Sequence, residues 1–212
     1  MLRNLILLLC LVATQASAGA WPRQKGSGFA SIATRLEFDE TYTLSPSYNS
    51  IYLEYGLNGR HTLGVDAGQT SDGATRTIAF LRMPLFETKR GNPVAVELGL
   101  GKIEEQIVLR PGMSWGRGLK YGWLAADGLA ELYETGNVTL KLDVTFGLKS
   151  KAGHMLILQL QNEKPIMAPT QTAFAPSVVL PFGKTRHLEI GGAMSLNDRE
   201  SYSFKFGLWQ DF

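Results

Sequence analysis

Residues 201–212 of this chain read SYSFKFGLWQDF. Large apolar side chains of this stretch fall on one side of an extended backbone: Tyr202, Phe204, Phe206, Leu208 and Phe212. Mostly small or polar side chains fall on the other side: Ser201, Ser203, Lys205, Gly207 and Asp211. This two-residue period predicts a β-strand with one apolar and one polar face. Because the ends of soluble domains are usually frayed and polar, this alternating aromatic strand is not expected of a soluble domain.

The same two-residue period recurs along the chain after residue 18, whereas helical apolar spacing is hard to find. The clearest example is Val138–Lys149, where Val, Leu and Phe alternate with Thr, Lys, Asp and Gly. Clusters of Gly, Asn, Asp, Ser and Pro separate the alternating segments. The pattern predicts an all-β chain of about twelve strands. They are expected at about 27–38, 48–57, 61–70, 74–85, 93–102, 107–116, 120–132, 138–149, 154–162, 171–181, 186–196 and 200–212.

The length of these segments favours a membrane barrel. Many reach about ten residues, longer than the usual strand of a globular protein and enough for a tilted strand to cross a bilayer. Tight and longer connections suit an antiparallel up-and-down barrel. A secreted β-sandwich or a soluble ligand-binding barrel would also alternate, but its solvated outer face would normally carry more Lys and Glu. The polar face here is rich in Gly, Ala, Ser and Thr, which predicts a transmembrane barrel with this face inside.

Residues 1–18 have the layout of a secretory signal peptide. Arg3 precedes the apolar stretch Leu5–Ala13, and the small residues Ala16-Ser17-Ala18 follow. The apolar stretch is too short for a transmembrane helix, which needs about 20 residues. We therefore expect cleavage after Ala18 and a barrel formed by residues 19–212.

Composition excludes several classes of site and partner. The 21 Lys and Arg residues nearly balance the 19 Asp and Glu residues, without runs of like charge, so nucleic acid is not an expected partner. The single cysteine, Cys10, lies in the expected leader, so the mature chain would have no disulfide and no thiolate metal site. His61, His154 and His187 lack the spacing of metal-binding motifs and are expected at strand ends. The sequence predicts no metal site, no cofactor and no catalytic residue.

The C-terminal stretch resembles the assembly signal of bacterial outer-membrane β-barrels. Lys205, Gly207 and Phe212 match that signal, whereas Gln210 stands where its first aromatic residue is expected. The expected mature start, Gly19-Ala20-Trp21-Pro22, resembles that of a small group of proteobacterial outer-membrane proteins. These resemblances imply a location in the Gram-negative outer membrane. Outer-membrane lipids and the barrel-assembly machinery would be the partners.

Aromatic residues are expected to form girdles at the membrane interfaces, where a Tyr or Trp ring can meet both hydrocarbon and headgroups. Trp21 and Pro22 are expected to form either a short lead-in with an aromatic ring at headgroup level or a spacer with a buried Trp. The other candidates fall largely towards segment ends: Tyr48, Tyr52, Tyr55, Trp115, Tyr121, Trp123, Tyr133, Tyr202 and Trp209.

The polar face supplies the candidate lining of the lumen. Its charged residues would be Arg35, Glu54, Asp66, Glu97, Arg110, Asp127, Lys141, Asp143, Glu189 and Lys205. Glu37 and Glu131 share this face, and Arg76 and Arg82 are expected there too. Charges of both signs can line a water-filled passage, or they can pair across a narrow interior and close it. Twelve strands lie between filled eight-stranded barrels and open sixteen-stranded porins, so size alone leaves both roles open.

Three functions are compatible with this pattern. The leading prediction is a small channel or export pore for small solutes, with a weak cation preference from the acidic excess in the lumen. The alternative is a closed structural barrel linked to exopolysaccharide secretion, and so to a surface polymer, or to envelope assembly. The third is a barrel-type lipid hydrolase or acyltransferase, in which Ser177 or Ser195 would approach His187. No activated-serine motif surrounds these residues, so an enzyme is not the prediction.

Overall fold

The computed structural model describes residues 19–38, 46–197 and 201–212. These residues form twelve antiparallel strands, which confirms the predicted fold class. The strands are β1 (Gly28–Phe38), β2 (Tyr48–Gly56), β3 (Thr62–Thr70), β4 (Thr75–Glu87), β5 (Pro93–Ile103), β6 (Gln106–Leu119), β7 (Gly122–Tyr133), β8 (Val138–Lys149), β9 (Met155–Pro165), β10 (Gln171–Pro181), β11 (Arg186–Ser195) and β12 (Tyr202–Asp211). Within these ranges, no helix is long and apolar enough to span a membrane.

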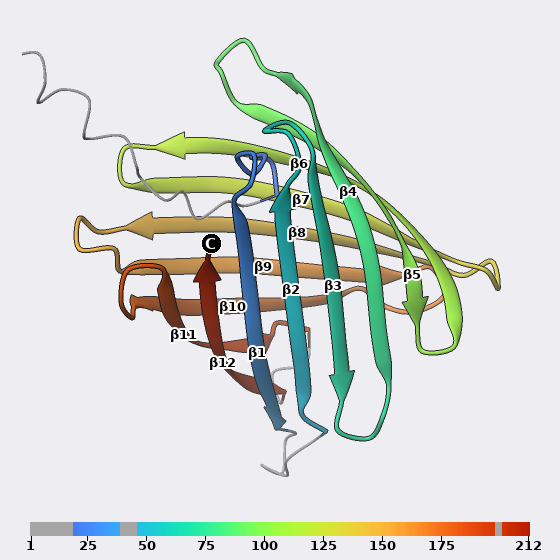
Figure 1. Cartoon of the computed structure of the whole chain (residues 1–212). Helices are drawn as coiled ribbons and strands as arrows, with labels where there is room; N and C mark the ends of the chain where they lie inside the picture. The colour runs from blue at the N-terminus through green and yellow to red at the C-terminus, as the bar shows by residue number, and fades with distance from the viewer. Residues whose placement is uncertain (1–18, 39–45, 198–200) are drawn as a thin grey trace, which may run out of the picture.

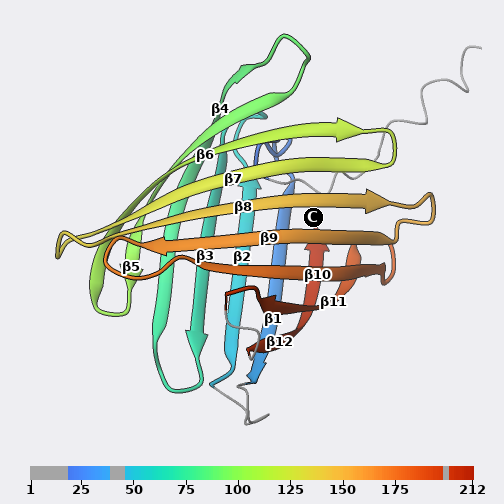
Figure 2. The ribbon, with the colours of Figure 1, turned by 180° about the vertical axis from the view of Figure 1, so that it is seen from behind.

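The strands close into a barrel. Each strand pairs with its neighbours in sequence, and β12 pairs with β1. The closure continues past β12, where the backbone of Gly28 and Phe212 exchanges hydrogen bonds of 2.6 and 3.0 Å. Figures 1 and 2 show the near and far walls crossing at a steep angle, as tilted barrel strands do. We call the end that holds Gly28 and Phe212 the terminal end, and the other the opposite end.

Alternation places apolar side chains outside the barrel and most charges inside. Ile32, Leu100 and Phe204 are 58%, 60% and 56% exposed on the outer face. The charged side chains of Glu54, Glu97, Arg110, Glu131 and Glu189, by contrast, are buried. The polar face therefore lies inside, as predicted. An apolar outer face of this kind fits a lipid environment.

Strand β4 departs from clean alternation because its inward face is partly apolar. Ile78 and Phe80 share this face with Arg76 and Arg82, and both apolar side chains are buried. The interior is therefore a packed core of aromatic and charged side chains along β4. This mixture explains why the sequence pattern of residues 74–85 is noisy.

The predicted aromatic girdles are only partly correct. Tyr55 and Tyr121 are exposed at the terminal end. Tyr52 and Trp123 instead point into the barrel, where Tyr52 contacts buried charges and Trp123 belongs to an apolar cluster. Trp21 packs against that same cluster, which agrees with the expected spacer with a buried Trp and not with a lead-in at headgroup level. Tyr52 lies at the middle of β2, so its place along the strand differs from the expected strand end.

Replacing Leu142 by arginine tests the outward face. Leu142 is exposed near the middle of β8, so the change should lower the free energy of unfolding in lipid vesicles by about 2–4 kcal/mol. Leu148→Arg is the matched control, because Leu148 is exposed near the end of the same strand. Its cost should be no more than about 1 kcal/mol. Equal small costs at both positions in urea titrations would contradict a lipid-facing β8.

Candidate functional site

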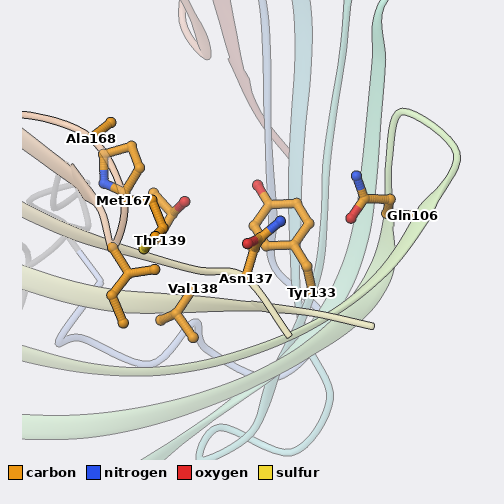
Figure 3. Close-up of a pocket in the computed structure, with 9 residues that line it drawn as sticks. Gln106, Tyr133, Asn137, Val138, Thr139, Met167 and Ala168 are labelled. Carbon is orange, nitrogen blue, oxygen red and sulfur yellow. The ribbon is translucent and has the colours of Figure 1, made fainter. Parts of the chain in front are cut away.

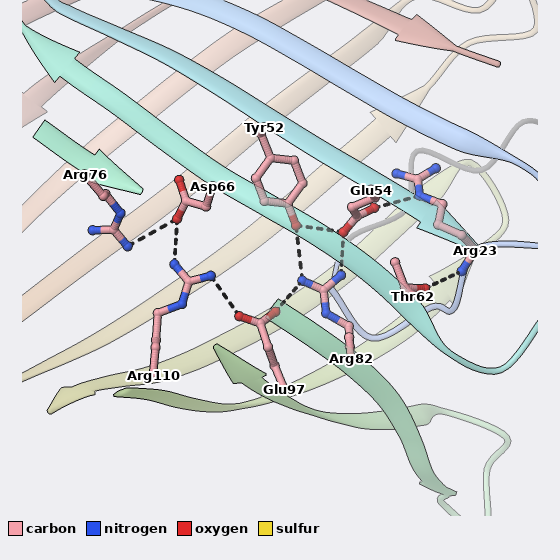
Figure 4. A network of polar contacts seen from close by, with 9 residues as sticks. All are labelled: Arg23, Tyr52, Glu54, Thr62, Asp66, Arg76, Arg82, Glu97 and Arg110. Carbon is pink, nitrogen blue, oxygen red and sulfur yellow. Dashed lines mark hydrogen bonds and ion pairs between the residues drawn. The ribbon is translucent and has the colours of Figure 1, made fainter. Parts of the chain in front are cut away.

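A chain of ion pairs starts inside the barrel at its terminal end. Arg23 Nε lies 2.7 Å from Glu54 Oε2, and Arg82 Nη1 lies 2.6 Å from Glu54 Oε1. Arg82 Nη2 reaches Glu97 Oε2 at 2.8 Å, and Arg110 Nη2 reaches Glu97 Oε1 at 3.0 Å. Figure 4 shows these side chains meeting from the segment before β1 and from strands β2, β4, β5 and β6. Each carboxylate thus bridges two guanidinium groups.

The chain of ion pairs continues to the opposite end. Asp66 Oδ2 bridges Arg110 at 2.6 Å and Arg76 at 3.2 Å. Arg76 also lies 2.7 Å from Glu131, which pairs with Lys141 at 3.3 Å. Lys141 finally reaches Glu163 on β9 at 3.2 Å. We call the whole series, from Arg23 to Glu163, the charge zipper.

The charge zipper is electrically balanced and largely buried. Five cationic and five anionic side chains alternate along it. The side chains of Arg110 and Glu97 are only 3% and 4% exposed. The hydroxyl of Tyr52 donates to Glu54 at 2.7 Å and accepts from Arg82 at 3.2 Å. Buried charges are tolerated only when paired and hydrogen-bonded, so the zipper acts as a single interdependent unit.

Phe80 fills the space between the zipper and strand β3. Its ring stacks on Tyr52 at a centroid distance of 5.7 Å, and the guanidinium carbons of Arg82 and Arg110 lie 5.1 and 5.5 Å from its centre. Gly64 allows this approach, because a Cβ atom there would stand 2.1 Å from the ring. Two cations over one buried ring add favourable electrostatic contacts to its packing.

Apart from Lys141 and Glu163, which end the zipper, the wall from β8 through β12 to β1 is lined differently. Many inward residues here are small, including Ala33, Ser177, Gly191 and Ser203. Its ion pair joins Lys205 Nζ to Glu189 Oε2 at 2.9 Å, and the Lys205 side chain is 34% exposed. Trp209 also donates to Glu189, at 3.0 Å. The same wall also holds the buried Met155 and Val179, which pack with Trp123 in an apolar cluster, whereas Lys205 is partly exposed.

Two inward aspartates remain outside all of these ion pairs. Asp127 on β7 and Asp143 on β8 are register partners, so two carboxylates face each other across neighbouring strands. No basic side chain in the described part of the chain forms an ion pair with either. The buried Oδ1 atom of Asp127 also has no hydrogen-bond partner there. Like charges directly opposite each other are unfavourable, so this pair favours a nearby cation.

The structure places the predicted lining residues on the inward face and shows that many of them pair. Glu54, Asp66, Glu97, Arg110 and Lys141 belong to the charge zipper. Glu189 pairs with Lys205, whereas Arg35 forms no ion pair among the described residues. Of the two predicted arrangements, the charges along the zipper therefore adopt the one in which they pair across the interior. Arg23 and Glu163 were not predicted, because Arg23 precedes the first strand and Glu163 lies just beyond the predicted 154–162 segment.

Other candidate chemistry is sparse in the part of the chain that the structure describes. No group of three or more His, Cys, Asp and Glu side chains there is suited to hold a metal ion. Ser150 Oγ lies 3.4 Å from His154 Nδ1, but this contact belongs to the exposed turn between β8 and β9. The same hydroxyl accepts from the backbone N–H of His154, as turn-stabilising serines do.

A pocket of about 300 Å³ opens at the opposite end (Figure 3). Pro165 and Ile166 line it beside the polar residues Gln106, Tyr133 and Asn137. The Tyr133 hydroxyl donates to Glu131 at 3.2 Å, so the pocket adjoins the end of the charge zipper. Its lining comes from β6 to β9 and from the turns after β7 and β9.

Comparison with protein-family models and with curated proteins finds no match. Among solved structures, the KdgM porin is similar with a TM-score of 0.66 and 9% identity, over 86% of this chain and 99% of the porin. A structure of KdgM porin in complex with disordered oligogalacturonate gives a TM-score of 0.64 at 10% identity, with the same coverage. The COG4313 outer membrane channel from Pseudomonas putida F1 gives 0.63 at 9% identity, over 92% of this chain and 99% of the channel. The chain thus has the closed twelve-stranded β-barrel fold of outer-membrane porins.

Proposed function

We propose that this protein is an outer-membrane channel for small polar solutes, with a narrow water path between the charge zipper and the wall from β8 through β12 to β1. The observation that carries the proposal is the difference in exposure between the two sides. Arg110 and Glu97 in the zipper are almost fully buried, whereas Lys205 on the other wall is 34% exposed. The zipper would act as a rigid wall and leave the opposite side to water.

The charges along this path favour a weak preference for cations. Asp127 and Asp143 carry no ion pair in the described chain, and Glu189 already neutralises Lys205. Arg35 is the inward base of β1 without such a partner there, so the acids are in slight excess. Fixed charges in a narrow lumen favour mobile ions of the opposite sign.

Single-channel recordings in planar bilayers test this function. The refolded mature chain should give small current steps and a reversal potential that indicates weak cation preference. Asp143→Asn should move the reversal potential towards anions, and Lys205→Gln should move it towards cations, because each removes one charge from the proposed path. Glu105→Gln is the control, since Glu105 is exposed in the turn between β5 and β6, away from the proposed path. Absence of current steps, or an unchanged reversal potential in both lumen variants, would overturn the channel.

A closed structural barrel is the second candidate, and one observation favours it. The charge zipper pairs five cations with five anions across the interior, which is how a narrow barrel would close itself. Under this alternative, the pure and fully folded protein would give no current steps in the same recordings.

A further inference from the structure

The residues just before β1 run inside the barrel. Ala20 is fully buried, and a Cβ atom built on Gly19 would stand 2.3 Å from Asp127 Oδ1. A Cβ atom on the inward Gly116 would stand 2.4 Å from the Trp21 ring. Trp21 packs against the apolar cluster built around Trp123 on the lumen wall. Residues 19–21 therefore occupy the lumen, with Gly19 beside Asp127 at the middle of β7.

Arg23 binds this segment to strands β2 and β3. Its backbone N–H donates to Thr62 Oγ1 at 3.0 Å, and its guanidinium joins Glu54 at 2.7 Å in the charge zipper. The guanidinium carbon also lies 4.8 Å from the centre of the Phe29 ring. With Arg23 held by β2 and β3 at the terminal end, and Gly19 lying against β6 and β7, residues 19–24 run from the terminal mouth into the lumen.

The first residue of this segment lies beside the two unpaired acids. Asp127 Oδ1 is buried without a partner, and Asp143 stands opposite it. The zipper is balanced, so none of its cations is in excess for these carboxylates. Removal of a leader after Ala18 would leave an α-ammonium group on Gly19, which is a cation of the right size at this position.

We propose that residues 19–24 form an internal plug of the channel, completed when leader cleavage frees the Gly19 ammonium to pair with Asp127 and Asp143. The proposal rests on the proposed channel function only for its effect on conductance. The plug itself is a structural arrangement that can be measured without current. Its anchors are the Arg23 ion pair at one wall and the ammonium at the other.

Cysteine labelling tests the plug directly. The mature chain would contain no cysteine, because Cys10 is the single one and lies in the expected leader. Ala20→Cys, in the buried part of the plug, should react with a water-soluble maleimide about a hundredfold more slowly than Gln24→Cys, which is exposed. Folding of both variants is verified by the gel mobility shift that heating produces in folded barrels. Equal labelling rates in folded protein would overturn the plug.

The ammonium pairing has its own test in the Ala20→Cys chain. Asp127→Asn together with Asp143→Asn, or one extra alanine ahead of Gly19, should each raise the labelling rate about tenfold, because each removes the pairing between the ammonium and the two carboxylates. Combining the two changes should raise it no further, since both remove the same interaction. Fully multiplicative effects would overturn the pairing.

Deletion of residues 19–24 separates this proposal from the channel itself. If the plug and the channel are both correct, the shortened chain should show larger conductance and stronger cation preference than the mature chain. Protected Ala20→Cys together with no current from the shortened chain would support the plug and overturn the channel. Equal conductance of the two chains, with fast labelling at position 20, would overturn the plug and leave the channel.

A separate feature is the charge of the turns at the two ends. The five turns of the terminal end carry basic residues and no acidic ones: Arg60, Lys89, Arg90, Lys120, Lys151 and Lys184. These side chains are all exposed. The described turns of the opposite end carry acidic residues and no basic ones: Asp72, Glu104, Glu105 and Glu134. The described turns of the two ends therefore carry opposite charges.

We infer that this basic rim binds the headgroups of anionic phospholipids in the leaflet at the terminal end. Exposed apolar and aromatic residues lie directly beside the rim, including Tyr121, Phe182 and Phe212. Lys120 Nζ lies 5.1 Å from the centre of the Tyr121 ring, so this base stands where an interfacial aromatic meets headgroups. Basic residues at a membrane surface favour anionic lipids.

Lipid-dependent stability tests the rim. The midpoint of thermal unfolding should rise when phosphatidylglycerol replaces part of the phosphatidylcholine in the vesicles. Changing Lys120, Lys151 and Lys184 together to Gln should abolish most of this rise. The affinity of the rim for anionic headgroups should fall about fivefold for each lysine removed. The control changes Asp72, Glu105 and Glu134 to their amides. An unchanged lipid dependence in the lysine variant would overturn lipid binding, whatever its reversal potential in planar bilayers. An altered reversal potential in that variant would then indicate that the rim acts on anionic solutes.

Discussion

Replacing Glu97 by glutamine is expected to lower the free energy of unfolding in lipid vesicles by about 3–5 kcal/mol. Glu97 bridges Arg82 and Arg110 at the centre of the charge zipper, and all three side chains are buried. Removing its charge leaves five cations against four anions in a region that water hardly reaches. The glutamine amide would also turn N–H groups towards a guanidinium. Urea titration followed by tryptophan fluorescence measures the loss.

Two further variants show whether the loss comes from the zipper. Glu163→Gln should cost no more than about 1 kcal/mol, because the Glu163 side chain is 45% exposed at the end of the series. The double variant Glu97→Gln with Arg82→Gln should lose less than the sum of the single changes, since it restores charge balance. Arg110 would keep Asp66, and Glu54 would keep Arg23. Additive losses would contradict an interdependent network.

Most of the barrel could be predicted from the sequence, because alternation reports directly which side chains share a face. Val138–Lys149 was predicted with the same bounds that β8 has in the structure. Parity also placed Glu54, Glu97 and Arg110 inside, because each lies among small or polar residues of one face. Alternation failed where the lumen is itself apolar, as at Ile78 and Phe80. A period-two pattern cannot separate lipid-facing from core-facing apolar residues.

The pairing of the charges could not be predicted, because it depends on barrel closure. Arg110 and Asp66 are 44 positions apart and lie on strands that are not neighbours in the sheet. Their contact follows from the curvature of the wall, which no local pattern encodes. The choice between the two expected positions of Trp21 was also beyond reach, since the segment before β1 has no regular period. Which charged residues pair in the site is thus determined by the closure of the barrel.

Phe80→Ala is expected to be the most destabilising change to the apolar part of the lumen, at about 3–5 kcal/mol. Phe80 is 2% exposed, and its ring contacts Tyr52 and the two arginines that flank Glu97. Its removal would leave a cavity beside buried charges, and water entering there would weaken their ion pairs. Phe80→Leu should cost less than about 1.5 kcal/mol, because it keeps most of the apolar volume. The free energy of unfolding in lipid vesicles is measured for the natural chain, Phe80→Ala and Phe80→Leu.

A second substitution distinguishes the packing of Phe80 from a general weakness of β3 and β4. Gly64→Ala should destabilise the natural chain, because its new Cβ atom would stand 2.1 Å from the Phe80 ring. In the Phe80→Ala background the clash with the ring is lost, whereas the contact of 2.7 Å with the Leu53 carbonyl oxygen remains, so the cost should fall without vanishing. A Gly64→Ala cost that is identical in both backgrounds would show that the ring does not occupy this position. Coupling between the two sites would instead establish that the lumen beside the charge zipper is filled by side chains, which confines the proposed solute path to the other wall.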